Sequence, residues 1–190
     1  MQISPDSPAA DDVRRLLDEH LTDMFATSPA ESVHALDHTA LLAPSVTFWT
    51  ARDDDGTLLG CGALKELDGT SGEIKSMRTA GPARGRGVAS ALLDVVLAEA
   101  ERRGYARVSL ETGTQDYFAP ARRLYTRHGF AECGPFGSYV LDPNSVFMTL
   151  ELPAGRPALG STGRPTEGSA PTSAPESREG AAAAGAPAAS

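Results

Sequence analysis

The sequence predicts a mixed α/β fold of the α+β type, in which a central sheet of six to seven strands is flanked by about four helices. Segments with helical apolar spacing and segments with strand-like alternation follow one another in the order helix, helix, three strands, helix, strand, helix, two strands. A hydrophobic fraction of 41% is enough for a packed core. Composition changes after Leu152 to a run rich in Ala, Gly, Pro and Ser. We therefore expect a folded domain over residues 1–152 and a disordered tail over residues 153–190, which cannot bury enough apolar surface to offset ordering.

The first half of the expected domain contains two helices and three strands. Apolar residues spaced by three and four predict a helix over Asp11–Phe25. Ser28-Pro29 begins an expected second helix that reaches Leu42. The strands are expected at Val46–Ala51, Leu58–Leu67 and Glu73–Thr79, after a first strand reduced to little more than Gln2-Ile3.

The second half alternates helices with strands. Val88–Arg103 has amphipathic helical spacing, and Gly104 follows as a left-handed cap. Pro120 suits the first turn of a further helix. The remaining strands are expected at Ala106–Thr112, Ala131–Phe136 and Val146–Leu152.

Charge and cysteine content exclude several classes of protein. The chain has 25 acidic and 17 basic residues, a net charge of −8, which argues against nucleic-acid and anionic-membrane partners. Cys61 and Cys133 are too few for a disulfide scaffold, and no His/Cys cluster has metal-ligand spacing, so we expect no metal. The N-terminus has no signal-peptide pattern, and no apolar stretch is long enough for a bilayer; we expect a soluble cytoplasmic protein.

A glycine-rich turn follows the third strand and precedes the Val88 helix. It reads Arg84-Gly85-Arg86-Gly87-Val88-Ala89. Glycines allow a ligand to approach the backbone closely, and the free N–H groups and dipole of a helix start suit a phosphate. A tight strand-to-helix connection with solvated arginines explains the same residues. Neither a P-loop nor a dinucleotide fingerprint fits the spacing.

Two motifs in this order resemble the Gcn5-related N-acetyltransferases. Arg84-x-x-Gly87-x-Ala89 matches the family signature Arg/Gln-x-x-Gly-x-Gly/Ala. Ala121-x-x-Leu124-Tyr125-x-x-x-Gly129-Phe130 is similar to the second family motif, a helix that ends in a Gly-Phe turn. One helix and one strand separate the motifs, as in the family, and the element order over residues 3–152 agrees. The chain looks like the small bacterial acetyltransferases of this family.

The resemblance implies that two strands, Glu73–Thr79 and Arg107–Thr112, splay apart around acetyl-coenzyme A as cosubstrate. The pantetheine arm would pair with the strand backbone, and the pyrophosphate would bind the N–H groups of the turn. The implied cofactor-binding residues are Met77, Arg78 and Thr79 on the strand, and Arg84, Gly85, Arg86, Gly87, Val88 and Ala89 in the turn.

The resemblance also implies residues for proton transfer. Tyr125 matches the family tyrosine that protonates the leaving thiolate, with a core tyrosine as the alternative. Glu73, eleven residues before Arg84, has the spacing of the glutamate base in histone-type members, and Glu111 on the partner strand competes for that role. We expect Glu73 to share a strand face with Lys75 and Met77; a salt bridge with Lys75 is the alternative to catalysis.

The resemblance places the acceptor between the first helices and the closing hairpin. His34, Glu111 and Tyr139 are the candidate acceptor-binding residues. The expected function is acetylation of a small amine, such as an amino acid or related metabolite. The alternatives are a non-catalytic acyl-coenzyme A sensor and a protein or peptide acetyltransferase. Dimers are frequent in the family, but no residue specifies an interface.

Overall fold

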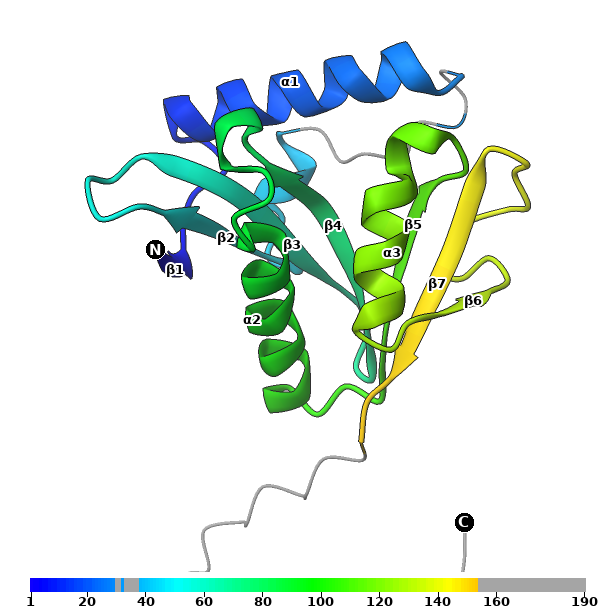
Figure 1. Ribbon diagram of the computed structural model, residues 1–190. Helices are drawn as coiled ribbons and strands as arrows, with labels where there is room; N and C mark the ends of the chain where they lie inside the picture. Colours follow the sequence, from blue (N-terminus) through cyan, green and yellow to red (C-terminus); the bar gives the residue numbers. More distant parts are fainter. Residues whose placement is uncertain (30–31, 33–37, 154–190) are drawn as a thin grey trace, which may run out of the picture. The chain divides into compact units, whose positions relative to one another are not determined.

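The computed structural model describes residues 1–29, 32 and 38–153. The expected tail lies outside the described residues except for Pro153, and so does the candidate acceptor residue His34. All seven strands form one sheet, in the order β1-β2-β3-β4-β5-β7-β6. The strands are β1 (Gln2–Pro5), β2 (Val46–Arg52), β3 (Leu58–Asp68), β4 (Ser71–Thr79), β5 (Arg107–Gly113), β6 (Ala131–Cys133) and β7 (Ser145–Glu151) (Figure 1).

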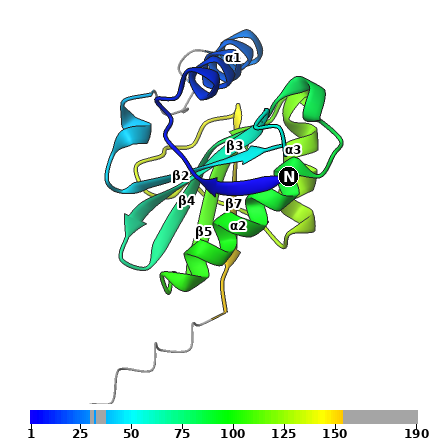
Figure 2. The same cartoon turned by 90° about the vertical axis from the view of Figure 1, so that its left-hand side faces the viewer.

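Helices cover both faces of this sheet. They are α1 (Asp11–Thr27), α2 (Val88–Arg102) and α3 (Ala119–Arg127), with short 3₁₀ turns at Ala40–Leu42, Gly81–Ala83 and Asp116–Phe118. On β3, Cys61 and Ala63 pack into the α1 core, whereas Leu64 packs into the α2 core. Because successive strand residues point to opposite faces, α1 lies on one side of the sheet and α2 on the other. Figures 1 and 2 show α1 lying apart from α2.

Helix α2 has the buried apolar face that its spacing predicts. Val88, Leu92, Leu93 and Val96 are all at most 2% exposed. Each such side chain contributes about 1.5–3 kcal/mol when it leaves water. Gly104 follows with φ of 75°, the left-handed cap that the sequence predicts.

Two expected elements differ from the structure. Of the expected second helix, residues 33–37 lie outside the described part, and Ala40–Leu42 forms only a 3₁₀ turn. Strand β6 ends at Cys133 and not at Phe136. Pro135 explains the early end, because proline has no N–H to donate to a sheet ladder.

A bulge in β4 reverses the face of its last residues. Ser76 has φ of 52°, and the register with β3 shifts at this point. Ile74 and Met77 therefore both face the α2 core, while Glu73 and Lys75 belong to the opposite face. The expectation that Met77 shares a face with Glu73 was wrong, because simple alternation does not continue through a bulge.

Candidate active site

Strands β4 and β5 are paired only where they begin. Ser71–Glu73 is in register with Arg107–Ser109, but β4 continues to Thr79 and β5 to Gly113 without further pairing between them. The strands diverge in this region (Figure 1). The predicted splay is confirmed. It leaves one backbone edge of Met77–Thr79 open to a ligand that pairs like an added strand.

The glycine-rich turn presents unpaired backbone N–H groups beside this opening. Gly85 and Gly87 have φ of 76° and 80°, which favour glycine, and their N–H groups have no hydrogen-bond partner among the described residues. Gly87 precedes α2, and no side chain caps the helix start. The N–H groups of Val88 and Ala89 belong to the first helical turn, which has no partner within the helix. This is the geometry that binds phosphate at helix starts.

The arginines around the opening have different surroundings. Arg86 forms an ion pair with Asp53 at 2.8 Å, on the turn between β2 and β3. Arg84 is exposed. Arg78 binds Asp23 of α1 and the hydroxyl of Tyr117, so its side chain ties β4 to α1. Arg84 is therefore better placed than Arg78 to reach an anionic ligand in solvent.

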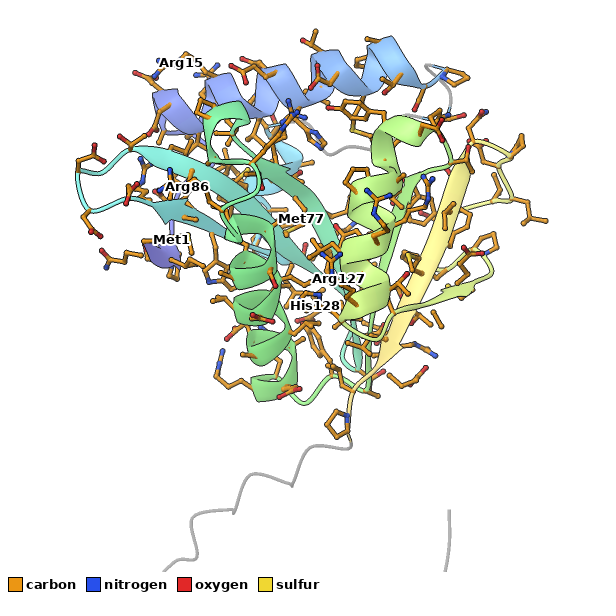
Figure 3. All side chains as sticks on the ribbon, viewed as in Figure 1. Met1, Arg15, Met77, Arg86, Arg127 and His128 are labelled. Carbon is orange, nitrogen blue, oxygen red and sulfur yellow. The ribbon has the colours of Figure 1, made fainter. Side chains whose placement is uncertain are left out.

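A small cavity of about 90 Å³ lies where the two strands diverge. Residues from β4, β5, α1 and α3 line it, among them Ser76, Met77, Glu111, His20 and Tyr125. Met77 is labelled in Figure 3. We call this space the small cavity. It brings together the predicted proton donor Tyr125 and the predicted carboxylate Glu111.

Tyr125 is buried in the wall of the small cavity. Its ring packs edge-on against Phe130, with centroids 5.6 Å apart. Burial raises the pKa of the Tyr125 hydroxyl. The phenol therefore stays protonated at neutral pH, which is the form that can donate a hydrogen bond to a leaving thiolate.

Glu111 lines the small cavity from β5. It is half-buried, and its Oε1 accepts a 2.7 Å hydrogen bond from the hydroxyl of Ser145 on β7. This contact orients the carboxylate. A carboxylate held in this way can attract an amine or accept a proton.

Glu73 lies beside Lys75 and Tyr139, and the charge of Glu111 also acts on Tyr139. Its Oε1 is 3.1 Å from Lys75 Nζ and accepts a 2.6 Å hydrogen bond from the hydroxyl of Tyr139. Lys75 Nζ in turn donates to that hydroxyl at 2.7 Å. Burial is the main cause that raises the pKa of the Tyr139 hydroxyl, and the negative charge of Glu73 raises it further. The structure thus contains the predicted Glu73–Lys75 salt bridge, and it brings Tyr139 to this cluster.

Sequence reasoning missed His20, which lines the small cavity from α1. Its Nδ1 is buried and has no hydrogen-bond partner among the described residues. Burial is the main cause that lowers the pKa of His20 to about 4, and the positive charge of Arg78 contributes to the same shift. The ring is therefore neutral at pH 7. The signal was present in the sequence, because Leu16, His20 and Met24 recur every four residues on one helix face.

Phe118 fills another part of the wall, seven residues before Tyr125. The Phe118 ring is 8% exposed and lies so close to Gly113 that an added Cβ would be 2.3 Å from it. Glycine is therefore the residue type that fits opposite this aromatic side chain, and Phe118 makes this part of the wall apolar.

Neither a metal-ion cluster nor a membrane-spanning helix occurs among the described residues. Within residues 1–29, 32 and 38–153, no three His, Cys, Asp or Glu side chains are grouped to hold a metal ion. In the same part of the chain, no helix is long and apolar enough to cross a membrane.

Comparisons with known proteins agree with this geometry. The acetyltransferase (GNAT) family matches residues 12–130. The chain is 51% identical over 152 residues to the uncharacterized N-acetyltransferase YsnE of Bacillus subtilis (strain 168), covering 80% of this chain and 100% of that protein. It is 41% identical over 154 residues to an IAA acetyltransferase of Azospirillum brasilense, covering 79% of this chain and 97% of that protein. The structure of a protein from Klebsiella pneumoniae assigned as an acyl-CoA N-acyltransferase matches this fold with a TM-score of 0.65 at 28% identity. The match covers 80% of this chain and 97% of that chain. The chain therefore belongs to the GNAT family of acetyl-CoA-dependent acyltransferases.

Proposed function

We propose that the protein transfers the acetyl group of acetyl-coenzyme A to the amine of a small acceptor by direct attack. The observation that carries this proposal is the small cavity. It joins Tyr125, Glu111 and the β4 backbone at Met77 where the two strands diverge. A proton donor, a carboxylate and an open strand edge are the groups that amine acetylation requires at one place.

The cofactor-binding residues are those that the turn and the open edge supply. Met77, Arg78 and Thr79 hold the pantetheine arm through their backbone, and the turn from Arg84 to Ala89 holds the pyrophosphate. A backbone N–H near Met77 stabilises the negative charge that develops on the thioester oxygen during attack. Tyr125 donates a hydrogen bond to the departing thiolate.

Glu111 is the better of the two candidate bases. It lines the small cavity together with Tyr125, and Glu73 does not. Glu111 therefore attracts the acceptor ammonium and receives its proton, directly or through water. Glu73 holds the Lys75–Tyr139 cluster that forms the adjoining wall.

The test is release of coenzyme A from acetyl-coenzyme A against separate pools of amino acids, polyamines, aminoglycosides and short peptides. We expect release with one pool and a Tyr125→Phe variant that binds acetyl-coenzyme A normally but turns over at least about tenfold more slowly. Tyr105→Phe is the matched control, because the Tyr105 hydroxyl binds Glu66 and does not line the small cavity. Tight cofactor binding without release from any pool would contradict the proposal and favour an acyl-coenzyme A sensor.

A further inference from the structure

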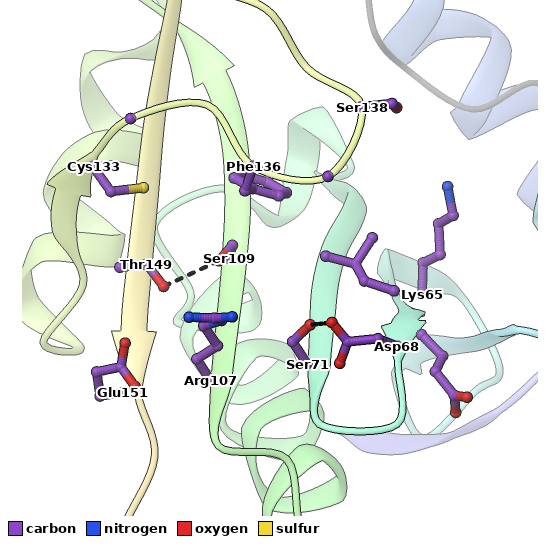
Figure 4. A pocket seen from close by; sticks show the side chains of 14 residues that line it. Lys65, Asp68, Ser71, Arg107, Ser109, Cys133, Phe136, Ser138, Thr149 and Glu151 are labelled. Atoms are coloured by element: carbon purple, nitrogen blue, oxygen red, sulfur yellow. Dashed lines mark hydrogen bonds between the residues drawn. The ribbon is translucent and has the colours of Figure 1, made fainter.

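A second, larger cavity of about 570 Å³ lies near the start of β5. Figure 4 shows Arg107 and Ser109 of β5, Ser71 of β4, Thr149 of β7 and Phe136 around it. We call this space the large cavity. Val108 and Leu110 of β5 belong to the α2 core, so the alternating residues Arg107, Ser109 and Glu111 share the opposite face of the sheet.

Arg107 is the central feature of the large cavity. Its guanidinium lies between Ser71 and Thr149 in Figure 4, and it forms no hydrogen bond or ion pair with any described residue. Lys65 lines the same cavity and likewise has no partner in the described part of the chain. Arg107 is exposed, and Glu66, Asp68 and Glu151 also line the cavity, so an anionic group is held here only where it contacts the Arg107 guanidinium directly.

The carboxylates nearby do not neutralise Arg107 by direct contact. Asp68 accepts hydrogen bonds from Ser71 and Thr70, which lower its pKa to about 2. Glu151 stands opposite Arg107 in the β5–β7 register without forming an ion pair with it. Glu151 thus makes the cavity less attractive to a bare anion and better suited to a ligand that Arg107 grips bidentately.

Tyr139 connects the large cavity with the small cavity. Its hydroxyl binds Lys75, which lines the small cavity, and its ring packs at 5.1 Å from Phe136, which lines the large one. Arg107 and Glu111 are four residues apart on β5, so their Cα atoms are separated by about 13 Å at roughly 3.3 Å per residue. A ligand that reaches both side chains therefore lies along β5 against the Tyr139 ring.

We propose that the acceptor is a zwitterion with well-separated charges, whose amine lies at Glu111 in the small cavity and whose carboxylate binds Arg107 in the large cavity. This inference rests on the proposed function. An extended di- or tripeptide spans about 7–11 Å at roughly 3.3–3.6 Å per residue, and the long Arg107 side chain covers the rest of the Cα separation. A free α-amino acid does not fit, because its two charged groups are on one carbon atom and cannot reach both sites.

The kinetic test compares di- and tripeptides with their C-terminal amides and with free glycine. We expect the wild-type kcat/KM to favour the free acids over the amides by about ten- to a hundredfold, the usual weight of hydrogen bonds to a charged group. In Arg107→Gln this ratio falls to about one, chiefly through KM for the acids. Glu151→Gln raises the ratio, because it removes the carboxylate opposite Arg107. Arg102→Gln is the matched control, since exposed Arg102 binds Glu99 and lines neither cavity, and it keeps the wild-type ratio.

A binding experiment separates this inference from the proposed function. N-acetyl-triglycine retains the carboxylate and needs no turnover, so its affinity is measured by titration calorimetry on the wild type and Arg107→Gln, with N-acetyl-triglycine amide as reference. Tighter binding of the acid that depends on Arg107 supports the carboxylate site. If that binding occurs but no amine is acetylated, the proposed function fails while the anion site stands. Equal kcat/KM for acids and amides, with no effect of Arg107→Gln on binding in a variant of normal circular dichroism, overturns the inference.

Discussion

The hydroxyl of Tyr139 donates a 2.6 Å hydrogen bond to Glu73, which lies 66 residues earlier in the chain. Glu73 is 2% exposed, and Lys75 forms a hydrogen bond with each of these two side chains. The bond therefore ties the loop between β6 and β7 to the buried middle of β4. The loop carries Phe136, which lines the large cavity, and Tyr139, whose ring packs against Phe136, so this bond positions the wall along which the proposed acceptor would lie.

The Tyr139→Phe variant is expected to lose stability but keep its fold. The change removes the bond to Glu73 and leaves Lys75 Nζ without that hydroxyl, a loss of about 1–3 kcal/mol in the free energy of unfolding. Urea denaturation measures the difference. Val140→Ala on the same loop is the control, because Val140 is 75% exposed and its truncation changes stability by at most about 0.5 kcal/mol. Equal stability of both variants would contradict the positioning role of the bond.

The Glu73–Lys75 pair is expected to be strongly coupled. Lys75→Met leaves a buried carboxylate without its ammonium partner and should cost about 3–5 kcal/mol of unfolding free energy. The Glu73→Gln/Lys75→Met double variant should recover a large part of this loss, because residue 73 then no longer carries a buried negative charge. A double-mutant cycle by chemical denaturation measures the coupling. Additive losses would show that the pair is not the source of the effect.

His20 predicts how stability changes at acidic pH. Its pKa is about 4 in the folded protein against an ordinary value of 6.5, so the unfolded chain binds a proton first as pH falls. This contribution is fully present above pH 6.5 and is lost as pH falls toward 4, with a limit of about 3 kcal/mol. Urea denaturation between about pH 7 and pH 4 should show a shallower dependence for His20→Asn. The prediction fails if the dependence for His20→Asn matches that of the wild type.

Gly87→Ala is expected to disturb the turn through its backbone. An added Cβ meets nothing within 4 Å, but φ is 80°, where an L-residue costs about 1–2 kcal/mol. Calorimetry should show weaker binding of coenzyme A, because the Gly87–Ala89 N–H groups lose their alignment. Gly81→Ala is a matched control: it has equal space and no positive φ. Equal affinity of both variants for coenzyme A would show that the turn does not bind the pyrophosphate.

The turn and helix α2 were predictable from sequence because their causes are local. Gly85 and Gly87 favour the left-handed backbone wherever they occur, and the spacing from Val88 to Val96 specifies a buried helix face. Each of the two motifs likewise lies on a single strand-to-helix or helix-to-turn unit. The position of Tyr125 on α3, ahead of the Gly-Phe turn, therefore follows from local spacing alone.

The surroundings of the carboxylates depended on tertiary structure. Nothing near Glu73 in the sequence indicates Tyr139, and the Ser76 bulge places Met77 on the face that simple alternation excludes. The sequence by itself determined the family, the phosphate-type turn and the list of candidate proton-transfer groups, because these depend on short-range spacing. Only the tertiary structure decided that Glu111, and not Glu73, shares a cavity with Tyr125, because that choice depends on where β4 and β5 separate and on which side chains from other elements reach each carboxylate.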